Sequence, residues 1–267
     1  MEMNSMIGKY GSCIKGTLML LFMTISPMVT AQKKDSTAVS SFGGAVTIQN
    51  KGISTIPNLT LGKPAAIFDL KVGRKLTFEP QFRFSLKGKP WAMVFWWRYN
   101  PTISDKFSLS FSANHSLSFK DIDTYTDTVS ASSREIIRTT RYVAAAITPN
   151  YRINNYLNVS MYWFYTRGIE SFITQNTYMV ALRPGISNIP VLKGFVARIG
   201  PEVYYLKMDD HSGYYFNASL SISKKNFPLS VSALLNKTLK SGIPSEYDFL
   251  WNVGLTYTFS NKYKQVQ

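Results

Sequence analysis

The amino-acid sequence predicts an all-β protein, a transmembrane antiparallel up-and-down β-barrel of about twelve strands. The first observation is strict alternation, clearest in residues 107–120, where Ser or Asn separates Phe, Leu, Ala and His. This period of two gives a β-strand one apolar and one polar face. The second observation is length. The run exceeds the about 5–6 residues of a usual globular strand and reaches the about 9–11 residues that cross a membrane.

Residues 1–31 have the organisation of a secretory signal peptide. Lys9 and Lys15 form a basic start, a short apolar stretch follows, and small residues precede a cleavage site after Ala31. The apolar stretch is too short for a transmembrane helix, which needs about 20 residues. Cleavage would remove Cys13, the single cysteine of the sequence, so the mature chain would have no disulfide and no thiol chemistry.

The rest of the chain divides into a polar periplasmic lead-in at 32–42, a barrel at 43–260 and a periplasmic tail at 261–267. The barrel contains twelve segments with alternating or strand-like composition, an even number that is typical of bacterial membrane barrels. These segments are 44–50, 65–72, 76–86, 91–99, 107–120, 136–148, 157–165, 177–183, 195–205, 214–223, 227–236 and 249–260.

In the first half, segments 65–72 and 76–86 alternate on either side of a tight turn at 73–75. Segment 91–99 carries aromatic residues at every other position. Segment 136–148 has strand-like composition, but its consecutive apolar residues do not show which face is apolar and which is polar. These elements predict hairpins joined alternately by short turns and longer connections.

In the second half, segments 214–223 and 227–236 alternate around a second tight turn at 224–226. Segment 249–260 places bulky aromatic and aliphatic residues opposite Asn, Thr and Ser. If the N-terminus is periplasmic, the tight turns are periplasmic too. The longer connections, predicted to lie at the external end, are 51–63, 121–133 and 240–247.

The formal net charge is +15, and its distribution favours anionic lipids and anionic solutes over nucleic acid. A nucleic-acid interface is typically a clustered basic patch. Here Lys and Arg are spread through connections and polar strand faces, without a basic run of five residues. The predicted export of the chain also argues against a nucleic-acid partner.

The final strand, Val253 to Phe259, resembles the C-terminal assembly signal of Gram-negative outer-membrane β-barrels, and the whole mature sequence resembles this class of porin-like proteins. The family signal ends at its aromatic residue, whereas residues 260–267 follow Phe259 here. The resemblance implies an outer-membrane location and contact with lipids and lipopolysaccharide. It also implies insertion by the barrel assembly machinery. Closure is required because lipid cannot satisfy an open sheet edge.

A soluble β-sandwich or lipocalin-like barrel is the alternative fold. Such a fold would place its bulky apolar faces inside and would have shorter strands. The sequence instead pairs bulky aromatic faces with faces of small Ser, Thr and Asn, which suit a wet interior.

Charged residues on the polar strand faces are the candidate site residues of the lumen. They could form a charged constriction, or they could be cross-strand ion pairs that brace the wall, which we favour because small barrels often have a filled interior. These residues are Asp69, Lys71, Glu79, Arg83, Arg98, Arg183, Arg198 and Glu202.

Aromatic residues on the opposite faces are candidates for the interfacial girdles of a membrane barrel rather than for a ligand site. These residues are Trp91, Trp97, Tyr99, Trp163, Tyr165, Trp251, Tyr257 and Phe259.

The resemblance also raises an enzyme hypothesis, because outer-membrane phospholipases and lipid A deacylases use a Ser and a His on the barrel wall. His115 shares its face with Ala113 and Leu117, so the nearby Ser116 points the other way. A hydroxyl from another strand could still approach His115. His211 follows two Asp residues in a possible but weak metal site. We therefore predict no catalytic residue, no metal and no cofactor.

The sequence favours a passive pore or narrow channel for small polar or anionic solutes. The alternatives are an outer-leaflet lipid-modifying enzyme and a non-conducting structural or adhesion barrel. A continuous wet lumen would favour the pore. A lumen closed by side chains would favour the structural barrel.

Overall fold

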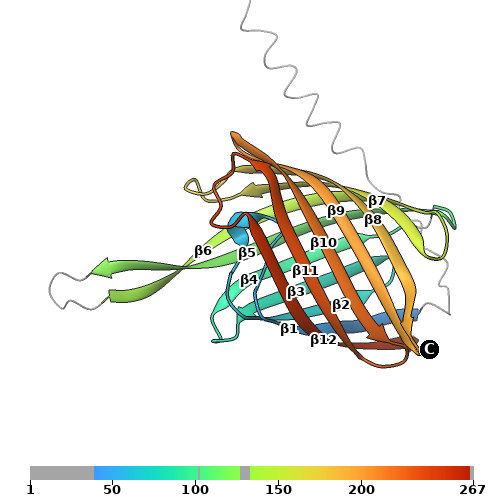
Figure 1. The fold of residues 1–267 in the computed structure, drawn as a ribbon. Helices are drawn as coiled ribbons and strands as arrows, with labels where there is room; N and C mark the ends of the chain where they lie inside the picture. The colour runs from blue at the N-terminus through green and yellow to red at the C-terminus, as the bar shows by residue number, and fades with distance from the viewer. Residues whose placement is uncertain (1–38, 102, 127–132, 265–267) are drawn as a thin grey trace, which may run out of the picture. The chain divides into compact units, whose positions relative to one another are not determined.

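The structure is a computed structural model that describes residues 39–101, 103–126 and 133–264. This part of the chain folds into twelve β-strands and one short 3₁₀ turn, η1 (Figure 1). The first six strands are β1 (Val39–Gln49), β2 (Ala65–Gly73), β3 (Leu76–Ser85), β4 (Pro90–Tyr99), β5 (Phe107–Thr126) and β6 (Ser133–Arg152). The last six are β7 (Leu157–Gly168), β8 (Asn176–Leu192), β9 (Phe195–Met208), β10 (His211–Lys224), β11 (Leu229–Ser241) and β12 (Phe249–Lys264).

The twelve strands close into one antiparallel barrel in which each strand pairs with its neighbours in sequence. The seam between β1 and β12 runs in register from Val39 opposite Lys264 to Gln49 opposite Gly254. Closure leaves no free sheet edge along the barrel wall, as a lipid environment requires. The predicted fold class and strand number are confirmed.

The two faces of each strand follow the predicted alternation. On β5, Phe111 is 42% exposed on the outer wall, whereas the neighbouring Ser112 and Asn114 are buried on the lumen side. The pattern also settles the faces of β6, where Ala144 and Ala146 point inward and Val143 points outward. The outer wall is therefore apolar, as in a barrel that lipid surrounds. No helix of the described residues is both long and apolar enough to cross a membrane.

The two ends of the barrel differ. The turn end carries the first residue of β1, the last residue of β12 and short turns such as those at 74–75 and 193–194. The loop end carries the longer connections, including 50–64 and 242–248. The predicted alternation of short and long connections holds only in part, because the loop end also carries the short turn 209–210 and the turn end carries the longer connection 100–106.

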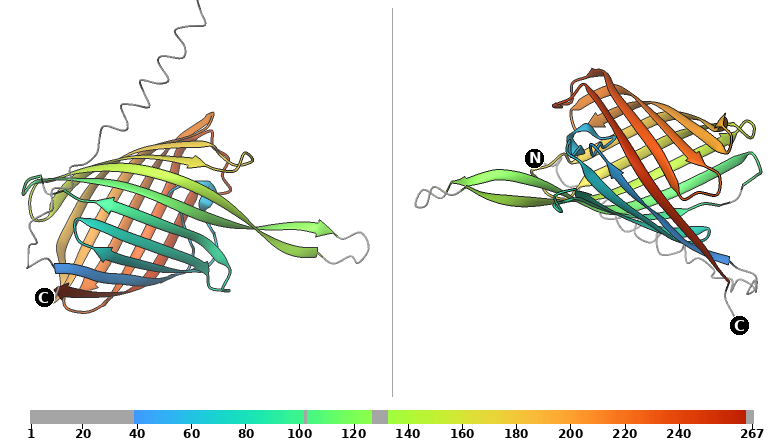
Figure 2. Two further views of the ribbon diagram at one scale, coloured as in Figure 1. Left: turned by 180° about the vertical axis from the view of Figure 1, so that it is seen from behind. Right: turned by 60° about the horizontal axis from the view of Figure 1, so that its bottom comes forward.

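Some boundaries differ from the prediction. β1 begins at Val39 and β12 ends at Lys264, so both terminal strands extend beyond the predicted barrel of 43–260. The predicted loop at 121–133 is largely wrong. β5 and β6 continue to pair through it and form a long hairpin that projects from the loop end (Figures 1 and 2). The predicted signal peptide at 1–31 lies outside the described residues.

The connection 50–64, which we name the inner loop, turns into the barrel. It contains η1 (Pro57–Leu59), which lies at the loop end in Figure 1. Its own backbone is closed by hydrogen bonds from the Gly52 amide to the Lys63 carbonyl at 2.8 Å and from the Leu61 amide to the Gly52 carbonyl at 3.0 Å. Ile53 is only 8% exposed, so an apolar side chain of this connection is buried inside the barrel.

Candidate functional site in the barrel lumen

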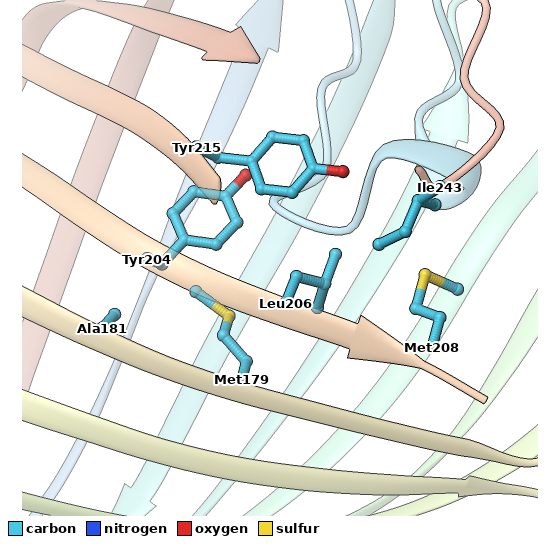
Figure 3. Close-up of a cluster of buried hydrophobic side chains, with 7 residues drawn as sticks. All are labelled: Met179, Ala181, Tyr204, Leu206, Met208, Tyr215 and Ile243. Carbon is cyan, nitrogen blue, oxygen red and sulfur yellow. The ribbon is translucent and has the colours of Figure 1, made fainter. Parts of the chain in front are cut away.

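An apolar cluster fills part of the lumen at the loop end (Figure 3). Tyr204 and Tyr215 stack at its centre, with ring centroids 5.0 Å apart and planes 13° apart. Ile56 of the inner loop packs against this cluster. The members, which come from β8, β9, β10 and the 242–248 connection, are Met179, Ala181, Tyr204, Leu206, Met208, Tyr215 and Ile243.

Hydrogen bonds fix the inner loop to the wall on opposite sides. The Tyr204 hydroxyl donates to the Thr55 carbonyl at 2.9 Å and accepts from the Asn236 amide at 3.1 Å. On β4, the Trp91 indole N–H donates to the Leu59 carbonyl at 2.9 Å. The inner loop is thus held by both apolar packing and polar contacts, because a buried carbonyl requires a donor.

Trp91 departs from the predicted outer girdle. It is 3% exposed and lies inside the barrel, where the Arg83 guanidinium stands 5.1 Å from its ring centroid. The reason is an irregularity in the pairing of β3 with β4, where the register shifts between Arg83 and Phe84. Such a bulge reverses the side-chain parity on one side of it. The assignment of Trp91 to the girdle is therefore wrong.

The remaining girdle candidates all lie on the outer wall. Tyr165 and Phe259 are half-buried there. The others are between 41% and 48% exposed: Trp97, Tyr99, Trp163, Trp251 and Tyr257.

The eight charged candidates lie on the lumen side, and the structure brings seven of them into groups. On β2 to β4, Glu79 pairs with the Lys71 ammonium at 2.8 Å and with the Arg98 guanidinium at 2.7 Å. Beside this group, Gln81 bridges two further candidates, since its amide donates to Asp69 and its carbonyl accepts from Arg83.

The second group lies on β8 and β9. The Arg183 guanidinium pairs with the Glu202 carboxylate at 2.9 Å and stands 3.9 Å from the ring centroid of Tyr162. Arg198 lies apart from both groups, beside a cavity of about 240 Å³ at the turn end. The pairs join neighbouring strands, which is the geometry that the bracing interpretation requires.

Inward aromatic residues were missing from the predicted site. Trp96 receives the Arg98 guanidinium at 4.5 Å from its ring centroid, and its ring lies 6.5 Å from that of Phe164. Phe164 in turn stacks on Tyr162 at 5.8 Å. The inward position of Trp96 could have been predicted from the sequence. Residues two apart in a strand face the same side, and Trp96 is two residues from Arg98, which was assigned to the lumen. Trp96, Phe164 and Tyr162 line the same cavity as the small inward residue Ala144 of β6.

Two cavities adjoin the inner loop. The inner cavity, of about 210 Å³, lies beneath the loop and is lined by residues of β3 to β9. The vestibule, of about 1460 Å³, lies at the loop end. Both are lined by Asn58, Leu59, Trp91 and Ser118, so the two cavities adjoin at these residues. The charged residues that line the vestibule are Lys63, Lys87, Lys89, Lys120 and Glu246.

The two histidines do not form a site of known catalytic geometry. His115 lies on the outer wall and stacks on Phe95 with ring centroids 4.8 Å apart. Its cross-strand partners are Phe95 and Val143, neither of which carries a hydroxyl. His211 begins β10, opposite Met208. Within the described ranges, no group of three His, Cys, Asp or Glu side chains could hold a metal ion.

Comparisons with known proteins give structural matches only. No family model and no curated protein match the sequence. The KdgM porin, solved with disordered oligogalacturonate, is 11% identical, with a TM-score of 0.48 over 82% of this chain and 99% of that chain. An outer membrane channel from Pseudomonas putida F1 is 10% identical, with a TM-score of 0.46 over 85% and 98%. OmpT, an outer membrane protein of Vibrio cholerae, is 10% identical, with a TM-score of 0.35 over 85% and 99%. At these values the likeness does not extend to function.

Proposed function

We propose that this protein is an outer-membrane channel of a Gram-negative bacterium that admits small polar solutes and prefers anions. The observation that carries the proposal is the inner loop, which turns into a polar lumen and has a cavity on each side. A loop that narrows a polar barrel leaves a restricted path rather than a wide aqueous pore. The channel would therefore select solutes by size as well as by charge.

The charge of the vestibule supports the preference for anions. Four lysines and one glutamate line it, so its field attracts anions before they reach the narrow part of the lumen. Charged mouths with low-dielectric walls raise the local concentration of the opposite charge. Rings of Lys and Arg are also the usual means of anion selection in pores.

The outer wall supports the membrane location. Residues such as Phe111 and Trp251 are more than 40% exposed on the wall, and lipid would cover them. Burial of apolar surface in lipid is favourable, at roughly 25 cal/mol per Å². We expect lipids and lipopolysaccharide as neighbours, and insertion by the barrel assembly machinery.

A non-conducting structural barrel is the second candidate, and the apolar cluster favours it. Tyr204, Tyr215 and Leu206 are at most 1% exposed, so part of the lumen is closed by side chains. The channel and the structural barrel differ in one respect, which is whether solutes can pass between the inner loop and the rest of the lumen. The cross-strand partners of His115, Phe95 and Val143, carry no hydroxyl, so they give no support to a lipid-modifying enzyme.

Single-channel recording on the reconstituted protein tests the proposal. We expect a small conductance with the native sequence and a larger one when residues 53–61 are replaced by a short Gly-Ser linker. A matched control shortens the projecting β5–β6 hairpin, which lies outside the lumen and should leave the conductance unchanged. Absence of current in both the native protein and the linker variant would favour the structural barrel.

A further inference from the structure

The inner cavity beneath the inner loop has the size and lining of a small-molecule site. Its volume is about 210 Å³, whereas one water needs only about 10–15 Å³. Aromatic rings, including Trp96 and Tyr162, share its wall with the polar groups of Asn114 and Arg183. A mixture of apolar faces and a few convergent polar groups is typical of ligand pockets.

Three polar atoms at this cavity have no hydrogen-bond partner among the described residues. They are Oδ1 of Asn114, Oδ1 of Asn58 and Nε of Arg183. Asn114 is 8% exposed and is one of the residues that line the inner cavity. Buried polar atoms are almost always paired, so these two acceptors and one donor specify the groups of a bound molecule. The molecule must offer hydroxyl or amine donors to the asparagines and an acceptor to the arginine.

The charge of the lining decides between a neutral and an anionic molecule. Arg83 and Arg183 are the charged side chains that line the inner cavity, and within the described part of the chain no carboxylate lines it. Both guanidinium groups are held in position, Arg183 by Glu202 and Arg83 by Gln81. Arginine in a fixed orientation is well suited to bind a carboxylate.

We infer that the inner cavity binds a small carboxylate that carries several hydroxyl groups. The carboxylate lies against the arginines, and the hydroxyls donate to Asn58 and Asn114. The inference rests on the proposed function, since it names the class of anion that the channel would take. The molecule enters from the lysine-lined vestibule, past the contact between Trp91 and Leu59, where the two cavities adjoin.

Calorimetric titration of the detergent-purified full chain with sodium gluconate tests this site without any need for conduction. We expect saturable binding with one gluconate per barrel. Sorbitol, which has the hydroxyls without the charge, and butyrate, which has the charge without the hydroxyls, should each bind more weakly. The variant N114L, which removes one acceptor at similar volume, should weaken gluconate binding about three- to tenfold.

The matched control is N217L. Asn217 is 7% exposed and also has an unpartnered Oδ1, but it does not line the inner cavity, so gluconate binding should be unchanged. Because a change on the wall could disturb folding, N58A in the inner loop gives a second test and should also weaken binding.

Each outcome separates the two proposals. No saturable gluconate binding, or equal weakening in N114L and N217L, would overturn the inference. A barrel that binds gluconate but does not conduct keeps the site and overturns the channel. A barrel that conducts but does not bind keeps the channel and overturns the site.

Discussion

The variant Tyr204→Phe tests whether one hydroxyl controls the position of the inner loop. The native hydroxyl donates to the Thr55 carbonyl and accepts from the Asn236 amide. The phenylalanine ring keeps the stacking on Tyr215 and the packing of the apolar cluster. The substitution therefore removes the polar contact with little change in volume.

The magnitude follows from comparing the docked and undocked loop. With the loop docked, the variant leaves the partly buried Thr55 carbonyl without its donor, at a cost of at most about 1–3 kcal/mol. With the loop undocked, water satisfies that carbonyl. In the variant, the Asn236 side-chain amide lacks the Tyr204 hydroxyl whether the loop is docked or undocked. Its loss therefore does not change the free-energy difference between the docked and the undocked loop. The undocked fraction should rise by at most roughly 5- to 150-fold.

Two measurements detect this shift. Trypsin should cut the variant faster after Lys51, near the start of the inner loop, and single-channel traces should show more frequent openings to a larger conductance. The control is Tyr215→Phe, which removes the 2.6 Å bond to Ser241 but no contact with the inner loop. Equal rates of cleavage in both variants and the native protein would refute the role of the Tyr204 hydroxyl.

Three further predictions concern the wall, the vestibule and one external connection. Phe111→Arg should block assembly, because a lipid-facing Arg near the midplane costs about 2–4 kcal/mol, whereas the lumen-facing Ser110→Arg should still give heat-modifiable migration in gels. Lowering the charge of the vestibule should move the reversal potential in a salt gradient toward cations. The three changes to combine are Lys63→Gln, Lys87→Gln and Lys120→Gln. The Glu170 carboxylate accepts hydrogen bonds from the Arg141 backbone N–H at 2.8 Å and from the Arg141 guanidinium at 2.6 Å. These two bonds hold the pKa of Glu170 below its usual value. The pKa of Glu170 is lower in the folded than in the unfolded protein. The contact with Arg141 therefore stabilises the connection 169–175 fully at a pH above the unfolded pKa of Glu170. This stabilisation is lost as the pH falls through the folded pKa, where Glu170 becomes protonated. The protection of the Arg141 amide against hydrogen exchange, relative to an unprotected amide at the same pH, should therefore fall in acid in the native protein but not in Glu170→Gln.

The barrel could be predicted because its physical cause is local. Alternation along β5 fixes which side chains face lipid, and lipid then requires the strands to close. The same parity placed the charged candidates on the lumen side, including Arg183 and Glu202 on neighbouring strands. Their pairing needed only the antiparallel register of β8 and β9.

What could not be predicted depends on tertiary contacts. The inner loop has no periodicity, and its position is set by partners far away in sequence, such as Tyr204 for Thr55. Trp91 was placed outside because a bulge reverses parity without a mark in the sequence. The projecting β5–β6 hairpin was missed because residues 121–133 are mostly polar and lack the apolar alternation of the wall strands.

The β1–β12 seam has a consequence for biogenesis. It joins the first and the last strand of the barrel, and its Thr47 and Thr256 hydroxyls, 2.9 Å apart, are separated by 209 positions in sequence. During synthesis and export, every intermediate therefore has two open edges until the final strand arrives. Such edges can pair with other chains, so the unclosed chain is prone to aggregation until the ring can close. The seam is also tight, because a Cβ on Gly43 would come within 2.8 Å of the Phe259 carbonyl oxygen on β12. Gly43→Val should thus delay the last step of maturation and leave earlier hairpins intact.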